Sequence, residues 1–246
     1  MRYGIVIDST VYLPKKMIEE NNIEVVSLNV EVVGEDSYKE KEITREFIIE
    51  KRNSGKSFIT SAPSPGEFLT AFQDLLVEND HVFVIGLSKN LSGTYQSSII
   101  AKTMLDSPDN VTIFDTNQSA YGNEMLVFEL QEMIDNNEEK ENIINRMNKL
   151  IKQSKLMFTC ENLFSLVAGG RLSNAKAMIG TVLRVKPIIE MIDGKLILYK
   201  SERTYKKIFS LIEQKILETS KGYHNLSFYI THTYSEKSGE QLFEFI

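Results

Sequence analysis

Strand-like runs alternate with amphipathic segments along the first 160 residues of the chain. The runs that favour strands lie at 3–7, 24–33, 81–87, 111–114 and 156–159. Between them, apolar residues recur at helical spacing. This alternation predicts βαβ units and a mostly parallel sheet with helices on its faces. The most polar stretch, 135–142, is predicted to be a solvated turn between two helices.

The pattern changes after Cys160, where Asp193-Gly194 separates two apolar runs and gives the strongest hairpin signal in the chain. Helices are expected at 163–168, 174–183, 204–220 and 236–246, and a strand at 226–231. An antiparallel hairpin after a parallel region favours a second, smaller α/β domain with a mixed sheet. We therefore expect an N-terminal α/β domain over 1–157 and a C-terminal α/β domain over 158–246.

Composition and charge narrow the class of protein. The 246 residues suffice for one large domain or two small ones, and 42% of them are hydrophobic. A net charge of -6 argues against a nucleic-acid partner, which needs clustered Lys and Arg. The single Cys160 excludes an intrachain disulfide. No apolar run approaches the roughly 20 residues of a membrane helix, and no secretory segment opens the chain. We expect a cytoplasmic protein without stable membrane insertion.

Two hydroxyl-bearing turns stand where a strand or loop gives way to a helix. The first is Thr60-Ser61-Ala62-Pro63-Ser64-Pro65, in which Ser64 is suited to cap the helix, Pro65 to its first position and Glu67 to bond back to the cap. The second is Leu91-Ser92-Gly93-Thr94-Tyr95, which follows a buried strand. Backbone N–H groups and the positive end of a helix dipole attract anions, so the pattern indicates a carboxylate or phosphate site without a cation.

Other chemistries have weaker support. Gly86-Leu87-Ser88-Lys89 comes close to a nucleophile elbow, but Asn90 replaces its last glycine. Asp8 follows the first strand, where an aspartyl-phosphate nucleophile would stand, yet a carboxylate that caps the turn Asp8-Ser9-Thr10 is the commoner arrangement. The alternative function is therefore an acyl hydrolase or phosphotransferase that uses Ser92, Ser88 or Asp8.

Metal and nucleotide sites lack their usual spacings. Three scattered histidines and one cysteine offer no set of metal ligands. Gly169-Gly170-Arg171 has neither the Walker lysine nor the three-glycine spacing of a dinucleotide site, and by itself it reads as a helix C-cap. No metal and no cofactor is expected.

Five motifs together resemble the DegV family in their order and spacing over nearly the whole chain. They are Ile7-Asp8-Ser9-Thr10, the Thr60–Pro65 turn, Leu91-Ser92-Gly93-Thr94-Tyr95-Gln96-Ser97, Gly169-Gly170-Arg171-Leu172 and Lys186-Pro187-Ile188-Ile189. The resemblance implies a non-catalytic, two-domain α/β protein that encloses a long-chain fatty acid such as palmitate between its domains. It also implies a carrier in lipid transport or fatty acid metabolism that presents the carboxyl group to a fatty acid kinase.

The resemblance assigns the carboxylate contacts to Thr60 and Ser92, with Ser61 and Gly93 as neighbours. Arg171, and with it Asp8, are candidates for a head-group or kinase-facing role. Ala62 departs from the glutamine that the family often has at this place. The chain also ends at Ile246, short of the family's final Gly/Pro-rich segment with its histidine, so we expect a truncated C-terminal domain.

The energetics suit such a carrier. Burial of a methylene is worth roughly 0.8 kcal/mol, so a chain of about sixteen carbons offers on the order of 10 kcal/mol before ordering costs are subtracted. Neutral hydroxyls then need only orient the carboxylate, and they leave one of its oxygens available for phosphorylation.

Overall fold

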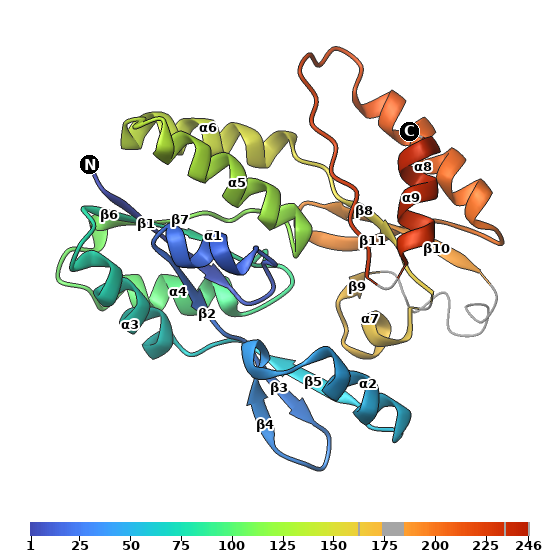
Figure 1. The fold of residues 1–246 in the computed structure, drawn as a ribbon, viewed down its shortest axis with the longest axis horizontal. Coiled ribbons are helices and arrows are strands. Elements are labelled where there is room, and N and C mark those ends of the chain that lie inside the picture. Colours follow the sequence, from blue (N-terminus) through green and yellow to red (C-terminus); the bar gives the residue numbers. More distant parts are fainter. Residues whose placement is uncertain (162, 174–184, 234, 246) are drawn as a thin grey trace. The chain divides into compact units, whose positions relative to one another are not determined.

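A computed structural model describes residues 1–161, 163–173, 185–233 and 235–245. The chain divides into two compact units, Met1–Ser154 and Lys155–Ile246, close to the boundary at 157–158 expected from the sequence. Each unit is described by itself (Figure 1).

The N-terminal unit is built on a four-stranded parallel sheet of order β2-β1-β6-β7. Its strands are β1 (Tyr3–Asp8), β2 (Ile23–Val26), β6 (His81–Ile85) and β7 (Val111–Ile113). Every residue of β1 and β6 is buried, which explains their continuous apolar sequence. The strand order reverses between β1 and β6, and the crevice beyond the carboxyl ends of such a pair is where open α/β sheets place ligands.

Helices cover both faces of this sheet (Figure 1). They are α1 (Lys15–Glu20), α3 (Pro65–Leu76), α4 (Thr94–Thr103), α5 (Tyr121–Asp135) and α6 (Lys140–Gln153), with the short 3-10 turn η2 (Pro108–Asn110) before β7. Alternate strand residues point to opposite faces. Ile5 and Phe83 accordingly pack with α5 and α6, whereas Val6 and Val82 pack with α3 and α4.

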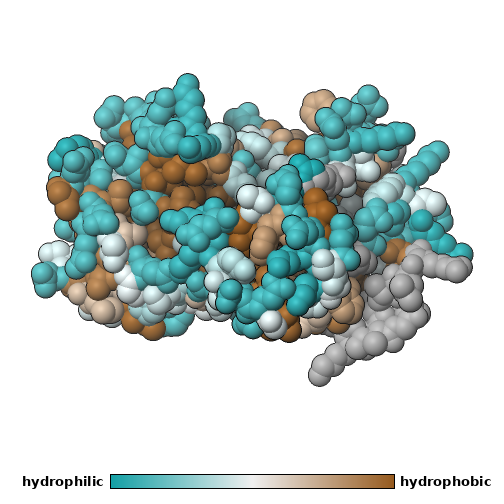
Figure 2. Space-filling view, turned by 60° about the horizontal axis from the view of Figure 1, so that its bottom comes forward, coloured by the Kyte–Doolittle hydropathy of each residue, from teal (hydrophilic) through white to brown (hydrophobic). Residues whose placement is uncertain are grey.

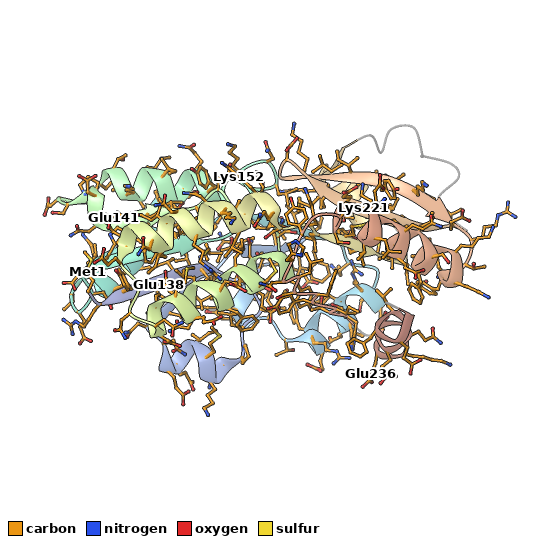
Figure 3. The ribbon with its side chains drawn as sticks, turned by 90° about the horizontal axis from the view of Figure 1, so that it is seen from above. Met1, Glu138, Glu141, Lys152, Lys221 and Glu236 are labelled. Carbon is orange, nitrogen blue, oxygen red and sulfur yellow. The ribbon has the colours of Figure 1, made fainter. Side chains whose placement is uncertain are left out.

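The turn between α5 and α6 is formed by 136–139, as the polar stretch predicts. The Tyr3 hydroxyl donates to the Glu138 carbonyl at 3.2 Å and ties this turn to β1. Figure 3 shows Glu138 and Glu141 at the same end of the unit as Met1.

A second, antiparallel sheet of order β4-β3-β5 was not foreseen from the sequence. It contains β3 (Asn29–Val32), β4 (Ser37–Lys39) and β5 (Phe58–Ser61), and the chain between β4 and β5 forms η1 (Glu40–Glu42) and α2 (Arg45–Asn53). The single strand expected at 24–33 is therefore wrong. Ser9 Oγ accepts the Leu28 N–H at 3.0 Å, and the Leu28 carbonyl accepts the Glu40 N–H at 2.9 Å, so the chain leaves the parallel sheet between β2 and β3.

The C-terminal unit has a mixed sheet of order β8-β10-β11-β9. Its strands are β8 (Met157–Thr159), β9 (Leu172–Ser173), β10 (Lys186–Ile192) and β11 (Lys195–Glu202), and its helices are α7 (Phe164–Ala168), α8 (Tyr205–Thr219) and α9 (Glu236–Phe245). The β10–β11 hairpin is confirmed. Asp193 and Gly194 have φ values of 48° and 73°, as a two-residue type I′ turn requires.

Two expectations for this region are wrong. The run at 156–159 supplies β8, which pairs antiparallel with β10 instead of extending the parallel sheet. The segment 226–231 forms no strand, because no strand of the described chain pairs with it. The helix expected at 174–183 lies outside the described residues.

The face shown in Figure 2 mixes hydrophilic and hydrophobic residues. No helix of the described chain is both long enough and apolar enough to cross a membrane.

The buried His81 makes a testable pH prediction. Burial, with a smaller effect of Lys140 and Lys102, lowers the pKa of His81 from 6.5 to about 4, and its Nε2 lies 2.9 Å from Thr112 Oγ1. The unfolded chain therefore takes up this proton first as the pH falls. The stability that the neutral ring contributes above pH 6.5 is lost progressively toward about pH 4.

We expect His81→Gln, which keeps a polar partner for Thr112, to show a flatter fall of the thermal unfolding midpoint than the unaltered protein as the pH is lowered from about 7 to about 5. The difference between the two curves isolates His81 from the carboxylates, which both proteins share. Parallel curves would contradict the prediction.

Candidate functional site

The first turn links β5 to α3 and contains the capping box that the sequence predicts. Ser64 Oγ accepts the Glu67 N–H at 3.4 Å, and Glu67 Oε2 accepts the Ser64 N–H at 2.9 Å, with Pro65 at the first helical position. The Ser64 hydroxyl is thus engaged by the helix start. Thr60 and Ser61, at the end of β5, are exposed.

A polar network fixes the position of this turn. Lys39 Nζ donates to Asn29 Oδ1 at 2.7 Å and forms an ion pair with Glu67, while Asn29 Nδ2 lies 3.4 Å from the Ala62 carbonyl. Burial alone would raise the pKa of Glu67, but the hydrogen bonds from Lys39 and Ser64 lower it below its usual value. Glu67 therefore neutralises the ammonium group that lies against the turn.

The second turn links β6 to α4. The Ser88 carbonyl accepts the N–H groups of Leu91 and Ser92 at 2.9 and 3.3 Å. Ser92 Oγ accepts the Thr94 N–H at 3.2 Å and lies 2.8 Å from Thr94 Oγ1. When the Thr94 hydroxyl donates to Ser92 Oγ, the Ser92 proton is left to donate elsewhere. Gly93 is exposed at the start of the helix.

Thr94 contacts a candidate site residue, and it was not itself among the site residues predicted from the sequence. It is 2% exposed and its hydroxyl is directed at Ser92 rather than at solvent. The signal was present as a Ser-x-Thr pattern at a helix start, where side-chain hydroxyls bond to the backbone and to each other.

The two turns lie near each other at Ala62 and Gly93. A Cβ built on Gly93 would lie 3.6 Å from the Ala62 Cβ, an ordinary van der Waals distance, so the space between the backbones has room for one more methyl group beside that of Ala62. The structure thus brings the Thr60–Ala62 segment beside Ser92 and Gly93, although 30 residues separate them in sequence. The donors gathered here are hydroxyls and backbone N–H groups, which can hold a carboxylate without a formal positive charge.

Asp8 lies behind these turns at the carboxyl end of β1 and is 1% exposed. Its Oδ1 accepts the N–H and the hydroxyl of Thr10 at 3.0 and 2.5 Å, and its Oδ2 accepts the Leu87 N–H at 2.6 Å. The expected cap on the turn 8–10 is confirmed. Burial raises the pKa of Asp8, and the three hydrogen bonds oppose this shift.

Ser88 does not have the surroundings of a nucleophile. The residue is fully buried, and its Oγ accepts the Asn90 N–H at 3.2 Å. His81 begins β6, whereas Ser88 follows the end of that strand, so the strand itself separates the two side chains. The arrangement of a serine beside an activating histidine is not formed by this pair.

Arg171 follows α7 in the C-terminal unit and is exposed. Gly170 has φ 69° and donates its N–H to Val167, and the Arg171 N–H donates to the Leu166 carbonyl at 3.0 Å. These two bonds form a Schellman motif, so the C-cap expected at Gly169-Gly170 is confirmed. Arg171 Nη1 also donates to the Gly169 carbonyl at 2.7 Å, which orients the guanidinium.

A cavity of about 10 Å³ lies beside Asp8, Gly86 and Thr94. This volume holds about one water molecule, so an acyl chain does not fit there. Among the residues that the structure describes, no three His, Cys, Asp or Glu side chains are placed to hold a metal ion.

Solved structures with the same fold include fatty-acid-binding proteins. One is reported as "Fatty Acid Binding of a DegV family Protein from Thermus thermophilus", with a TM-score of 0.82 and 31% identity over 90% of this chain and 79% of that one. Another is DegV, a fatty acid binding protein from Bacillus subtilis, with a TM-score of 0.77 and 32% identity over 89% of this chain and 78% of that one.

Sequence relatives give the same family. A DegV domain-containing protein of Listeria innocua is 32% identical over 241 residues, which cover 97% of this chain and 85% of the relative. One from Staphylococcus aureus is 32% identical over 214 residues, 87% of this chain and 76% of the relative. The family model described as "Uncharacterised protein, DegV family" matches residues 2–246. The chain belongs to the DegV family.

Proposed function

We propose that this protein binds a long-chain fatty acid and holds its carboxylate at the two neighbouring turns. Thr60 and Ser92 are the hydroxyl donors, and Ser61 and Gly93 are their neighbours. The observation that carries the proposal is the proximity of the two hydroxyl-bearing segments, since a Cβ added to Gly93 would lie 3.6 Å from the Ala62 Cβ. The fatty-acid-binding relatives from Thermus thermophilus and Bacillus subtilis, at 31% and 32% identity, support the same ligand class.

The charges around the turns suit a carboxylate that must be held and then released. Lys39 is paired with Glu67, and Lys89 is paired with Asp115 at 2.8 Å. A carboxylate bound here keeps its charge through hydrogen bonds from neutral donors, which are weaker than an added ion pair with a bidentate arginine. Burial of the alkyl tail, at roughly 0.8 kcal/mol per methylene, supplies the larger part of the affinity.

We further propose that the protein is a carrier, and that a fatty acid kinase supplies the catalysis. Arg171 is the candidate for contact with that kinase, because its guanidinium is exposed and is anchored to the Schellman loop. Asp8 is 1% exposed and is bonded to Thr10 and Leu87, so we assign it no contact with a partner surface. A long-chain fatty acid is then a ligand and cargo, and its phosphorylation belongs to fatty acid metabolism.

The first prediction concerns the bound ligand. We expect organic-solvent extraction of the purified, folded protein to release about one long-chain fatty acid per chain, identified by mass spectrometry. Added palmitate should raise the thermal midpoint of the delipidated protein, because a ligand of the native state stabilises it by mass action. The absence of both signals would contradict fatty acid binding, and turnover of acyl esters or acyl phosphates would favour an enzyme.

The second prediction concerns the Ser92 hydroxyl. Ser92→Ala should weaken palmitate binding by about 1 kcal/mol or more, since a hydrogen bond to a charged group is lost. Titration of delipidated protein measures the affinity. Thr70→Ala serves as the control, because the exposed Thr70 hydroxyl bonds only to its own helix at the Gly66 carbonyl. Equal affinities of Ser92→Ala and the unaltered protein would leave Ser92 as a helix cap alone.

The third prediction separates binding from presentation. Arg171→Ala should reduce phosphorylation of the bound fatty acid by the cognate kinase more than it reduces palmitate affinity. Phosphorylation is followed with radiolabelled ATP at saturating palmitate. Losses of equal size in both assays would contradict a kinase-facing role.

A further inference from the structure

One buried peptide group at the carboxyl end of β6 is held at both ends by buried side chains. The N–H of Leu87 donates to Asp8 Oδ2 at 2.6 Å. The carbonyl of Gly86, in the same peptide group, accepts from Asn123 Nδ2 and from Thr116 Oγ1, each at 2.9 Å. Asp8, Thr116 and Asn123 are at most 1% exposed. They come from β1, the segment after β7 and helix α5, so three elements converge on one amide.

The approach of Asp8 to this amide is close enough to require glycine at position 86. A Cβ built there would lie 2.6 Å from Asp8 Oδ2, well inside van der Waals contact. The site lies between β1 and β6, where the strand order reverses. The hydrogen bonds that hold the amide thus lie at the carboxyl ends of β1 and β6, next to the edge where doubly wound sheets bind their ligands.

The held amide precedes Ser88, which makes one backbone hydrogen bond to Gln118 and one to Ser92. Ser88, the next residue, donates its N–H to the Gln118 carbonyl at 2.9 Å. The Ser88 carbonyl in turn accepts the Ser92 N–H at 3.3 Å. The Gly86–Leu87 amide and the Gln118 carbonyl therefore hold Ser88 together, and the Ser88 carbonyl in turn holds the Ser92 backbone.

We infer that Asp8 is a positioning residue for the candidate carboxylate site, and that it acts by fixing the orientation of the Gly86–Leu87 amide together with Asn123. This inference rests on the proposed function. A carboxylate has only acceptors, so it holds the N–H side of the amide toward itself. Asn123 and Thr116 present donors to the carbonyl side. A flipped amide would set its carbonyl against the Asp8 carboxylate, which has only acceptors, whereas Asn123 has an oxygen that can turn toward an N–H, so Asp8 supplies the stronger constraint.

The three hydrogen bonds that Asp8 accepts also explain why an amide is a poor substitute. Oδ1 accepts two bonds from Thr10 and Oδ2 accepts one from Leu87, so both oxygens are engaged. Asparagine keeps the size of the side chain but replaces one oxygen with a donor. That donor must face the Thr10 N–H or the Leu87 N–H, and one of these hydrogen bonds is lost.

The test compares Asp8→Asn with Val82→Ala, a substitution in the core of the same sheet that touches neither turn. We expect palmitate affinity of delipidated Asp8→Asn to fall about tenfold, and that of Val82→Ala to stay within about twofold. In the Asp8→Asn background, Ser92→Ala should lower palmitate affinity by less than about twofold, because a Ser92 hydroxyl that is already displaced contributes little to binding. Additive losses from Asp8→Asn and Ser92→Ala would overturn the inference.

Amide hydrogen exchange supplies a readout that needs no ligand. The Leu87 and Ser92 amides should exchange at least about tenfold faster in Asp8→Asn than in Val82→Ala at matched global stability. If wild-type protein does not bind palmitate, the proposed function is wrong. The exchange rates of the Leu87 and Ser92 amides still test whether Asp8 positions the loop. Equal exchange in the two variants, or faster exchange with unchanged palmitate affinity, would overturn the inference.

Two further variants keep the test decisive if Asp8→Asn does not fold. Gly86→Ala should reproduce the loss of palmitate affinity, because its methyl group displaces Asp8 Oδ2. Gly66→Ala is the matched control, since its Cβ would meet nothing nearer than Ser64 Oγ at 3.9 Å. Thr116→Val removes one of the two donors to the Gly86 carbonyl. It should lower palmitate affinity less than Gly86→Ala does. Unchanged affinity in both Gly86→Ala and Thr116→Val would contradict the positioning role.

Discussion

The hydrogen bond from the Leu87 N–H to the buried Asp8 carboxylate is the constraint on which the arrangement of the N-terminal unit depends. It joins the carboxyl ends of the two central strands, 79 residues apart in sequence, at the place where the strand order reverses. A buried carboxylate is costly unless its oxygens are hydrogen-bonded, and here Thr10 and Leu87 supply three donors to them. The loop that carries Ser92 therefore leaves β6 in a single direction, and the second hydroxyl-bearing turn is presented at the edge of the sheet.

The small antiparallel sheet completes the candidate site from the other side. The chain leaves the parallel sheet after β2 because Ser9 and Glu40 hold both the N–H and the carbonyl of Leu28. This departure creates β3, whose pairing with β5 sets the position of Thr60 opposite Val30. The segment that follows β5 then brings a second set of hydroxyl and backbone donors near Gly93, at Ala62.

The donors at the two turns are neutral, which affects where the affinity for the proposed fatty acid comes from. The lysines that flank the two turns are paired with Glu67 and Asp115, so they contribute little net attraction for an anion. Affinity then comes mainly from the alkyl chain, which is the same for every long-chain acid, and the head-group contacts decide orientation. A partner that must reach the carboxylate does not have to break an ion pair. The exposed guanidinium of Arg171, held by its own Schellman loop, remains suited to contact with such a partner.

The features that depend on neighbours within a few residues followed from the amino-acid sequence. The Ser64 capping box, the Asp193-Gly194 hairpin and the helix end at Gly169 rest on local hydrogen bonds or on backbone conformations that a residue type permits, and each formed as predicted. The family motifs also identified the fold class and the ligand class of the relatives. Three features became visible in the folded chain: 24–33 divides between two sheets, β8 joins the C-terminal sheet, and Asp8 holds Leu87. These outcomes depend on which distant strand or amide supplies the hydrogen-bond partner, and a single sequence read along its length does not specify that partner.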